Sequence, residues 1–134
     1  MDDETTQIYD AVGGDKPFHD LVNAFYAGVE ADPVLRPLYP DDMTRAKEHL
    51  ALFFIQRFGG HAAYGEQRGH PRLRMRHVPF RIGPAERDAW LRAMSVALDS
   101  VPAFAPHRAA LDRYFVEAAN FLVNTDTIPT ITLP

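Results

Sequence analysis

His77 lies among closely spaced arginines in one short segment of the chain. Residues 68–81 contain five arginines together with this histidine. Three interpretations fit such a segment: a basic face in water, a nucleic-acid patch, or the edge of a haem site. No stacking aromatic residues alternate with the arginines, and the chain carries a net charge of −4, so nucleic acid is the less favoured partner.

The haem interpretation rests on what a short helix over residues 71–78 would present. Haem is a flat apolar plate with two carboxylates, so it needs an axial nitrogen ligand, apolar cover and nearby cations. Leu73, His77 and Phe80 lie near one face of such a helix. Arg74 and Arg76 flank that face. The segment therefore offers an imidazole, apolar neighbours and cations to one ligand.

Other metal chemistry is disfavoured by the rest of the composition. The chain has no cysteine, which excludes iron–sulfur clusters, thiolate zinc sites, disulfides and covalent haem attachment. The other histidines show no HExxH or other compact ligand spacing: they are His19, His49, His61, His70 and His107. A zinc site is therefore not expected.

Three polar aromatic residues fall on faces that are predicted to point inward. Tyr26 lies on the apolar stripe of its helix, Tyr39 ends a short turn, and Trp90 leads the stripe of a later helix. A buried tyrosine or tryptophan needs a partner for its O–H or N–H. Two interpretations stay open: each donates to a backbone carbonyl, or the three converge on a cavity and stabilise a partly negative diatomic ligand.

Glycine and proline residues mark the ends of the helices that must position these side chains. The apolar spacing predicts four substantial helices and two short ones, with no convincing strand, and therefore a compact helical sandwich. Asp15 is expected to cap the first long helix. The expected segments are helical turns over 7–12, a helix over 15–30, a turn over 34–39, a helix over 41–58, an ordered loop over 61–69, a short helix over 71–78, and helices over 83–101 and 107–123.

Length and composition predict a single domain over residues 1–134, with its core in about 7–124 and a loose tail over 125–134. The hydrophobic share of 46% suffices for a proper core. No apolar run approaches the roughly 20 residues that span a bilayer, and the chain begins with acidic and polar residues. We therefore expect a soluble, cytoplasmic protein with no integral membrane segment.

Longer motifs between residues 8 and 124 resemble the group II branch of the truncated haemoglobins. The most specific is the run from Glu66 to His77, with the sequence EQRGHPRLRMRH. The shorter motifs are Tyr9-Asp10-Ala11-Val12-Gly13-Gly14, Phe25-Tyr26, Leu38-Tyr39-Pro40, Gly59-Gly60 and Arg87-Asp88-Ala89-Trp90-Leu91. The resemblance implies an all-α fold, a shortened globin built as a two-over-two helical sandwich.

The resemblance also implies roles for residues around the iron. His77 would be the proximal iron ligand and Tyr26 the distal tyrosine, while Trp90 would be the tryptophan that marks this branch. Tyr39 sits where the family carries a tyrosine, phenylalanine or histidine. Ala46 stands where many globins place a distal histidine. Because alanine cannot hydrogen-bond a ligand, that task falls to Tyr26, Tyr39 and Trp90.

The remaining contacts implied by the resemblance form the walls and the edge of the haem site. His49 stands where relatives often carry an arginine near a haem carboxylate, so its charge there would depend on pH. The full set of expected haem-binding residues is Ala46, His49, Leu50, Phe53, Phe54, Phe58, Leu73, Arg74, Arg76, His77, Phe80 and Ile82.

The expected function is reversible binding of O2 at the five-coordinate ferrous iron of one haem b per chain, for storage, transport or sensing. NO, CO and peroxide are the other expected ligands. The alternative is a redox enzyme that uses the same haem for nitric oxide dioxygenation or peroxidase chemistry, served by a separate electron-donor reductase. A helical interaction module without haem would leave the arginine–histidine segment unexplained. The sequence does not decide between a monomer and a homodimer.

Overall fold

The computed structural model describes residues 4–69, 72–77 and 80–124, apart from the side chains of residues 73 and 74. These ranges contain helices and turns but no strand, and none of their helices has the length and apolar character that crossing a bilayer requires. The tail expected over 125–134 lies outside the described residues. With 3-10 helices written as η, the elements in chain order are η1 (Glu4–Gln7), α1 (Ile8–Val12), α2 (Asp15–Ala31), η2 (Arg36–Leu38), α3 (Thr44–Arg57), α4 (Ala63–Arg68), α5 (Leu73–His77), α6 (Pro84–Asp99), η3 (Pro102–His107) and α7 (Arg108–Leu122).

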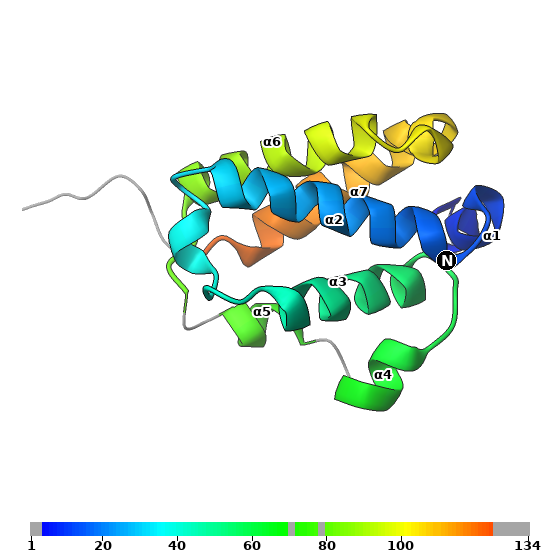
Figure 1. Ribbon diagram of the computed structural model, residues 1–134, viewed down its shortest axis with the longest axis horizontal. Coiled ribbons are helices and arrows are strands. Elements are labelled where there is room, and N and C mark those ends of the chain that lie inside the picture. The colour runs from blue at the N-terminus through cyan, green and yellow to red at the C-terminus, as the bar shows by residue number, and fades with distance from the viewer. Residues whose placement is uncertain (1–3, 70–71, 78–79, 125–134) are drawn as a thin grey trace, which may run out of the picture.

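Four long helices carry the fold. α2 runs between α3 and α6 and contacts both, and α6 also packs against α7 (Figure 1). The short helix α5 lies against α7, while α4 packs on α3. This is the all-α, two-over-two helical sandwich that was expected from the sequence.

An aromatic cluster joins these helices. Phe18 of α2 is completely buried, and its ring centroid lies 5.9 Å from that of Phe58 and 5.3 Å from that of Phe104. Phe58 also approaches α7, with 6.1 Å between its centroid and that of Phe115. Burying one such side chain contributes roughly 1.5–3 kcal/mol, so the cluster ties α2, the end of α3, η3 and α7 together.

The starts of two long helices differ from the expected ones, and Asp15 does not cap α2. α2 begins at Asp15 with Gly14 in the N-cap position, and no side chain caps it. The Asp15 carboxylate instead accepts a hydrogen bond from the Tyr9 hydroxyl at 2.7 Å and lies 3.1 Å from His61 Nε2. The helix expected from residue 41 begins at Thr44, whose amide donates to the Asp42 carboxylate at 3.0 Å.

Two segments between the long helices are more regular than expected. Residues 63–68, within the expected loop over 61–69, form α4, and the proline-rich segment 102–107 forms η3. α4 is tied to α3 because the Gly65 amide donates to Gln56 Oε1 at 2.8 Å. This partner lies outside the α4 segment, so the local apolar pattern does not reveal it.

Gly59 allows a tight turn where α3 ends. Its φ is +103°, and a Cβ atom there would lie 2.0 Å from the Thr6 carbonyl oxygen. Only glycine accepts both that conformation and that approach. The turn leaves the Phe58 carbonyl to accept a hydrogen bond from the Tyr9 amide at 2.9 Å, which links α1 to the end of α3.

Candidate functional site

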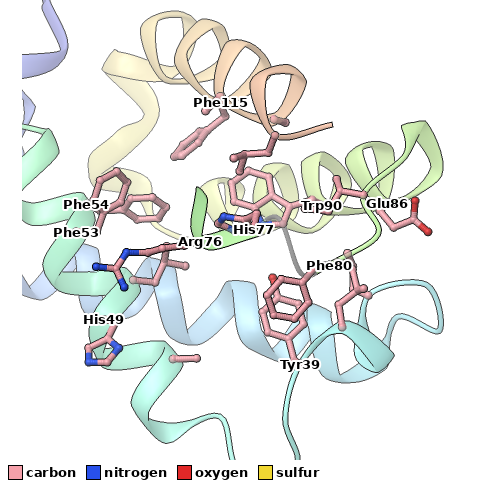
Figure 2. Close-up of a pocket in the computed structure, with 18 of the residues that line it drawn as sticks. Tyr39, His49, Phe53, Phe54, Arg76, His77, Phe80, Glu86, Trp90 and Phe115 are labelled. Atoms are coloured by element: carbon pink, nitrogen blue, oxygen red, sulfur yellow. The ribbon is translucent and has the colours of Figure 1, made fainter. Parts of the chain in front are cut away.

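A largely apolar cavity of about 410 Å³ lies between the long helices and α5. Its volume falls within the range of roughly 300–1,000 Å³ that is usual for small-molecule and cofactor sites. Figure 2 shows side chains of α3, α5, α6 and α7 around this space. Twelve of the residues singled out from the sequence line it: Tyr26, Tyr39, Ala46, His49, Leu50, Phe53, Phe54, Arg76, His77, Phe80, Ile82 and Trp90.

Phe58 is the expected contact that the structure does not bring to the cavity. Its side chain is fully buried, and its ring lies among those of Phe18, Tyr114 and Phe115 in the aromatic cluster. Phe58 is the C-cap residue of α3, one turn beyond Phe54, and its amide donates to the Phe54 carbonyl oxygen at 2.9 Å, but Phe54 alone of the two lines the cavity. The side chains of residues 73 and 74, also expected to contact haem, lie outside the described part of the structure.

His77 reaches the cavity from the last position of α5. A helix of five residues is far below the roughly 12–15 residues that an isolated helix needs, so its neighbours must hold it. On one side, Arg76 Nη2 donates to the Arg68 carbonyl oxygen at 3.1 Å. On the other, the Phe80 amide donates to the His77 carbonyl oxygen at 3.0 Å, and the two rings lie 6.3 Å apart between centroids.

Trp90 is placed by a well-defined start of α6. Pro84 occupies the first turn, and the Glu86 carboxylate accepts a hydrogen bond from the Gly83 amide at 2.8 Å. The Trp90 ring packs between Phe25 of α2 and Phe115 of α7, at centroid distances of 5.1 and 5.6 Å. The indole is therefore held on both sides at the cavity wall.

The two tyrosines meet beside the indole. The rings of Tyr26 and Tyr39 are 5.5 Å apart in an edge-to-face arrangement. Burial raises the pKa of Tyr39 to about 12, and a hydrogen bond from Trp90 opposes that rise. Burial, and then the neighbouring Tyr39, raise the pKa of Tyr26 as well. Both phenols are therefore protonated at neutral pH and can act as donors.

The direction of the Trp90–Tyr39 hydrogen bond follows from the chemistry of the two groups. An indole N–H can only donate, so the Tyr39 oxygen accepts and the phenolic proton remains available to another acceptor. Of the two interpretations left open by the sequence, the structure favours convergence, because all three polar aromatics line one cavity.

Arg68 is a cavity-lining residue that the sequence analysis did not assign to the site. It closes α4, and its Nη1 donates to His49 Nδ1 at 3.0 Å. Since a guanidinium cannot accept, His49 must be the neutral acceptor in this pair. Burial, followed by the positive charges of Arg68 and Arg45, lowers the pKa of His49.

We predict that Arg68→Gln raises the pKa of His49 toward the ordinary value of about 6.5. Because folding lowers this pKa, the unfolded chain binds more protons as the pH falls below about 6.5, and acid destabilises the fold through His49. NMR titration of the histidine ring protons in both proteins, at the same haem content, tests the shift. His61, which lies beside Asp15 and does not line the cavity, is the internal control. A His49 pKa that is the same in both proteins would contradict the pairing.

The other lining residues that were not assigned are mostly apolar side chains of η2, α4 and α7. Helical periodicity cannot distinguish a cavity wall from a filled core. The unassigned lining residues are Leu35, Leu38, Pro40, Tyr64, Glu86, Arg87, Tyr114, Phe115, Ala118, Ala119 and Leu122.

The donor set fits haem. The cavity is lined mainly by apolar side chains, with His77 as an imidazole and Arg68 and Arg76 as cations. Within the described residues, Arg68 Nε is the buried side-chain nitrogen or oxygen that lacks a hydrogen-bond partner. A buried polar group without a partner is costly, and an anionic group beside this guanidinium would offset that cost.

A helical sandwich with an imidazole and three polar aromatics on one apolar cavity is the architecture of a truncated globin. The model of the family "Bacterial-like globin" matches residues 7–119, and the chain belongs to this family. Within it, the chain resembles the group 2 truncated hemoglobin YjbI of Bacillus subtilis (strain 168), at 41% identity over 93 residues that cover 69% of this chain and 70% of that protein. The group II resemblance expected from the motifs is confirmed.

Solved structures agree with this placement. The hemoglobin of the thermophilic phototrophic bacterium Chloroflexus aurantiacus is 52% identical, with a TM-score of 0.85 over 88% of this chain and 98% of that one. A truncated oxygen-avid haemoglobin from Bacillus subtilis is 37% identical, with a TM-score of 0.82 over 87% of this chain and 98% of that one. Proteins of this family are haem-binding globins that take small ligands.

Proposed function

We propose that this globin holds one haem b per chain in the cavity, with His77 as the axial ligand, and binds O2 reversibly. The observation that carries the proposal is a single apolar cavity that is lined by the His77 imidazole and by three polar aromatic side chains. Similarity to an oxygen-avid haemoglobin supports O2 as the ligand. Reversible binding needs ferrous iron, so we also propose a cytoplasmic reductase as electron donor.

When bound, haem supplies an iron whose free coordination position takes a diatomic molecule. The phenol groups of Tyr26 and Tyr39 provide donors at the cavity, which would stabilise negative charge on a bound molecule, and Trp90 supports them by donating to the Tyr39 oxygen. One such hydrogen bond contributes about 1 kcal/mol. Ala46 provides no donor, and Leu50 adds apolar cover that excludes water. The donors therefore slow ligand release.

The basic side chains act on the other part of the cofactor. Arg68 and Arg76 line the cavity and carry the positive charge that two haem carboxylates require. His49 is held neutral by Arg68, so it serves as a hydrogen-bonding neighbour and not as a cation. We expect Arg68 to take the place that the sequence analysis gave to His49.

Spectroscopy of the purified, haem-loaded protein tests this function. We expect one haem per chain, a five-coordinate ferrous form, and a spectrum that changes and recovers over repeated cycles of O2 addition and removal. Oxidation of the iron within the first cycle would overturn reversible binding. Sustained consumption of nitric oxide or peroxide over many turnovers with an electron donor would assign catalysis in its place, whereas consumption that stops after one equivalent supports binding.

A further inference from the structure

Asn124, just beyond the end of α7, holds the segment that follows His77. Its Nδ2 donates to the carbonyl oxygens of Phe80 at 2.9 Å and His77 at 3.3 Å. Its Oδ1 accepts a hydrogen bond from the Ile82 amide at 2.9 Å, and its own amide donates to the Ile82 carbonyl oxygen at 2.8 Å. One residue thereby fixes the backbone at three positions between His77 and Ile82.

A carboxamide is the side chain that suits these partners. It carries two N–H donors and an acceptor oxygen, and here it uses both kinds of group. An aspartate at position 124 would keep the acceptor for the Ile82 amide but place a negative oxygen against the carbonyls of His77 and Phe80. A leucine, which has a similar size, would make none of the three side-chain hydrogen bonds.

The contact matters because α5 cannot fix His77 by itself. The Arg76–Arg68 hydrogen bond ties α5 to the end of α4. On the far side, the His77 carbonyl oxygen accepts from both the Phe80 amide and the Asn124 side chain. The backbone at His77 and at Phe80 is therefore positioned from the end of α7, a helix of 15 residues that is anchored in the core.

We infer that Asn124 is a positioning residue for His77, and that it sets the angle at which the imidazole meets the haem iron. The inference rests on the proposed haem function and deepens it. Asn124 does not line the cavity, so it acts on the ligand through the backbone and not by touching haem. Partners that orient a metal ligand commonly change metal affinity roughly 10–100-fold when they are removed.

Two variants of the haem-loaded protein separate the contacts. Asn124→Leu removes the three side-chain hydrogen bonds described above, whereas Asn124→Asp removes the two of them that are donated to His77 and Phe80. Asn120→Leu is the matched control, because Asn120 also lies on α7 and its side chain accepts a hydrogen bond at 3.3 Å from Nη1 of Arg87, a residue outside the range from His77 to Ile82. The readouts are the iron–imidazole stretch of the ferrous, ligand-free form, the rate of haem loss, and hydrogen exchange of the Ile82 amide.

We expect a shifted and broadened iron–imidazole stretch in both Asn124 variants, with haem loss about tenfold faster. The Ile82 amide should exchange faster in Asn124→Leu but stay protected in Asn124→Asp, and Asn120→Leu should match the wild type. If Asn124→Leu does not fold, Asn124→Asp decides. If the iron–imidazole stretch keeps its wild-type frequency and width in the folded Asn124 variants, the positioning role of Asn124 is overturned and the proposed function is not. If the wild-type protein shows no iron–imidazole stretch, both the proposed function and the role of Asn124 are overturned.

Discussion

Replacing His77 with alanine is expected to abolish stable haem binding. The variant loses the only nitrogen ligand that we assign to the iron, while the apolar walls of the cavity remain. Loss of a residue that merely orients a metal ligand costs roughly 10–100-fold in affinity, so loss of the ligand should accelerate haem release by more than about 100-fold. Transfer of haem to an excess of a haem-scavenging apoprotein measures the rate.

His61→Ala is the control for this experiment. His61 is exposed, contacts Asp15 and does not line the cavity, so its removal should leave haem release unchanged. Imidazole added to His77→Ala should partly restore the wild-type spectrum, because it can occupy the space left by the side chain. Normal haem occupancy and slow release in His77→Ala without imidazole would show that another residue binds the iron.

The second large effect is expected from Trp90→Phe, which should speed O2 dissociation about tenfold. The substitution removes the indole N–H and with it the hydrogen bond that this group donates to Tyr39. A loss of 1.4 kcal/mol corresponds to a tenfold change in an equilibrium constant, and one or two weakened hydrogen bonds account for that amount. Stopped-flow measurement of O2 release from the ferrous protein tests it.

A double-variant comparison separates the two ways in which Trp90 can act. If part of the effect passes through Tyr39, then Trp90→Phe should have a smaller effect in a Tyr39→Phe background, since residues in contact are not additive. Tyr114→Phe is the control. Tyr114 also lines the cavity, but it packs against Arg57, whose guanidinium carbon lies 4.5 Å from the centroid of the Tyr114 ring. Removing its hydroxyl should therefore leave the O2 release rate unchanged. An O2 release rate unchanged by Trp90→Phe would contradict the proposed role of the indole.

The long helices and most of the side chains that meet at the cavity were predictable because their signals are local. The spacing of Phe18, Val22 and Phe25 fixes the inner face of α2, and all three are buried. The run from Glu66 to His77 is long enough to identify the family. Trp90 and Tyr26 lie on regular helical stripes, so their inward direction follows from the periodicity.

The residues that were left out of the site or assigned to it wrongly depend on contacts between distant segments of the chain. Arg68 was left out of the site because the loop expected over 61–69 gave it no direction, and Gln56 of α3 holds the helix that it closes. Phe58 was assigned to the cavity by the family resemblance, whereas its ring packs in the aromatic cluster with side chains of other segments. Asn124 belongs to no periodic pattern, and only the folded chain shows that it reaches the segment after His77.

The central claim is that the His77 imidazole is the axial ligand to a haem iron in this cavity. Resonance Raman spectroscopy of the ferrous, ligand-free protein tests it most directly, with a second sample in which the histidines are labelled with nitrogen-15. We expect an iron–imidazole stretch that shifts to lower frequency on labelling and disappears in His77→Ala. A spectrum without such a band, or a band that persists in His77→Ala, would contradict the assignment.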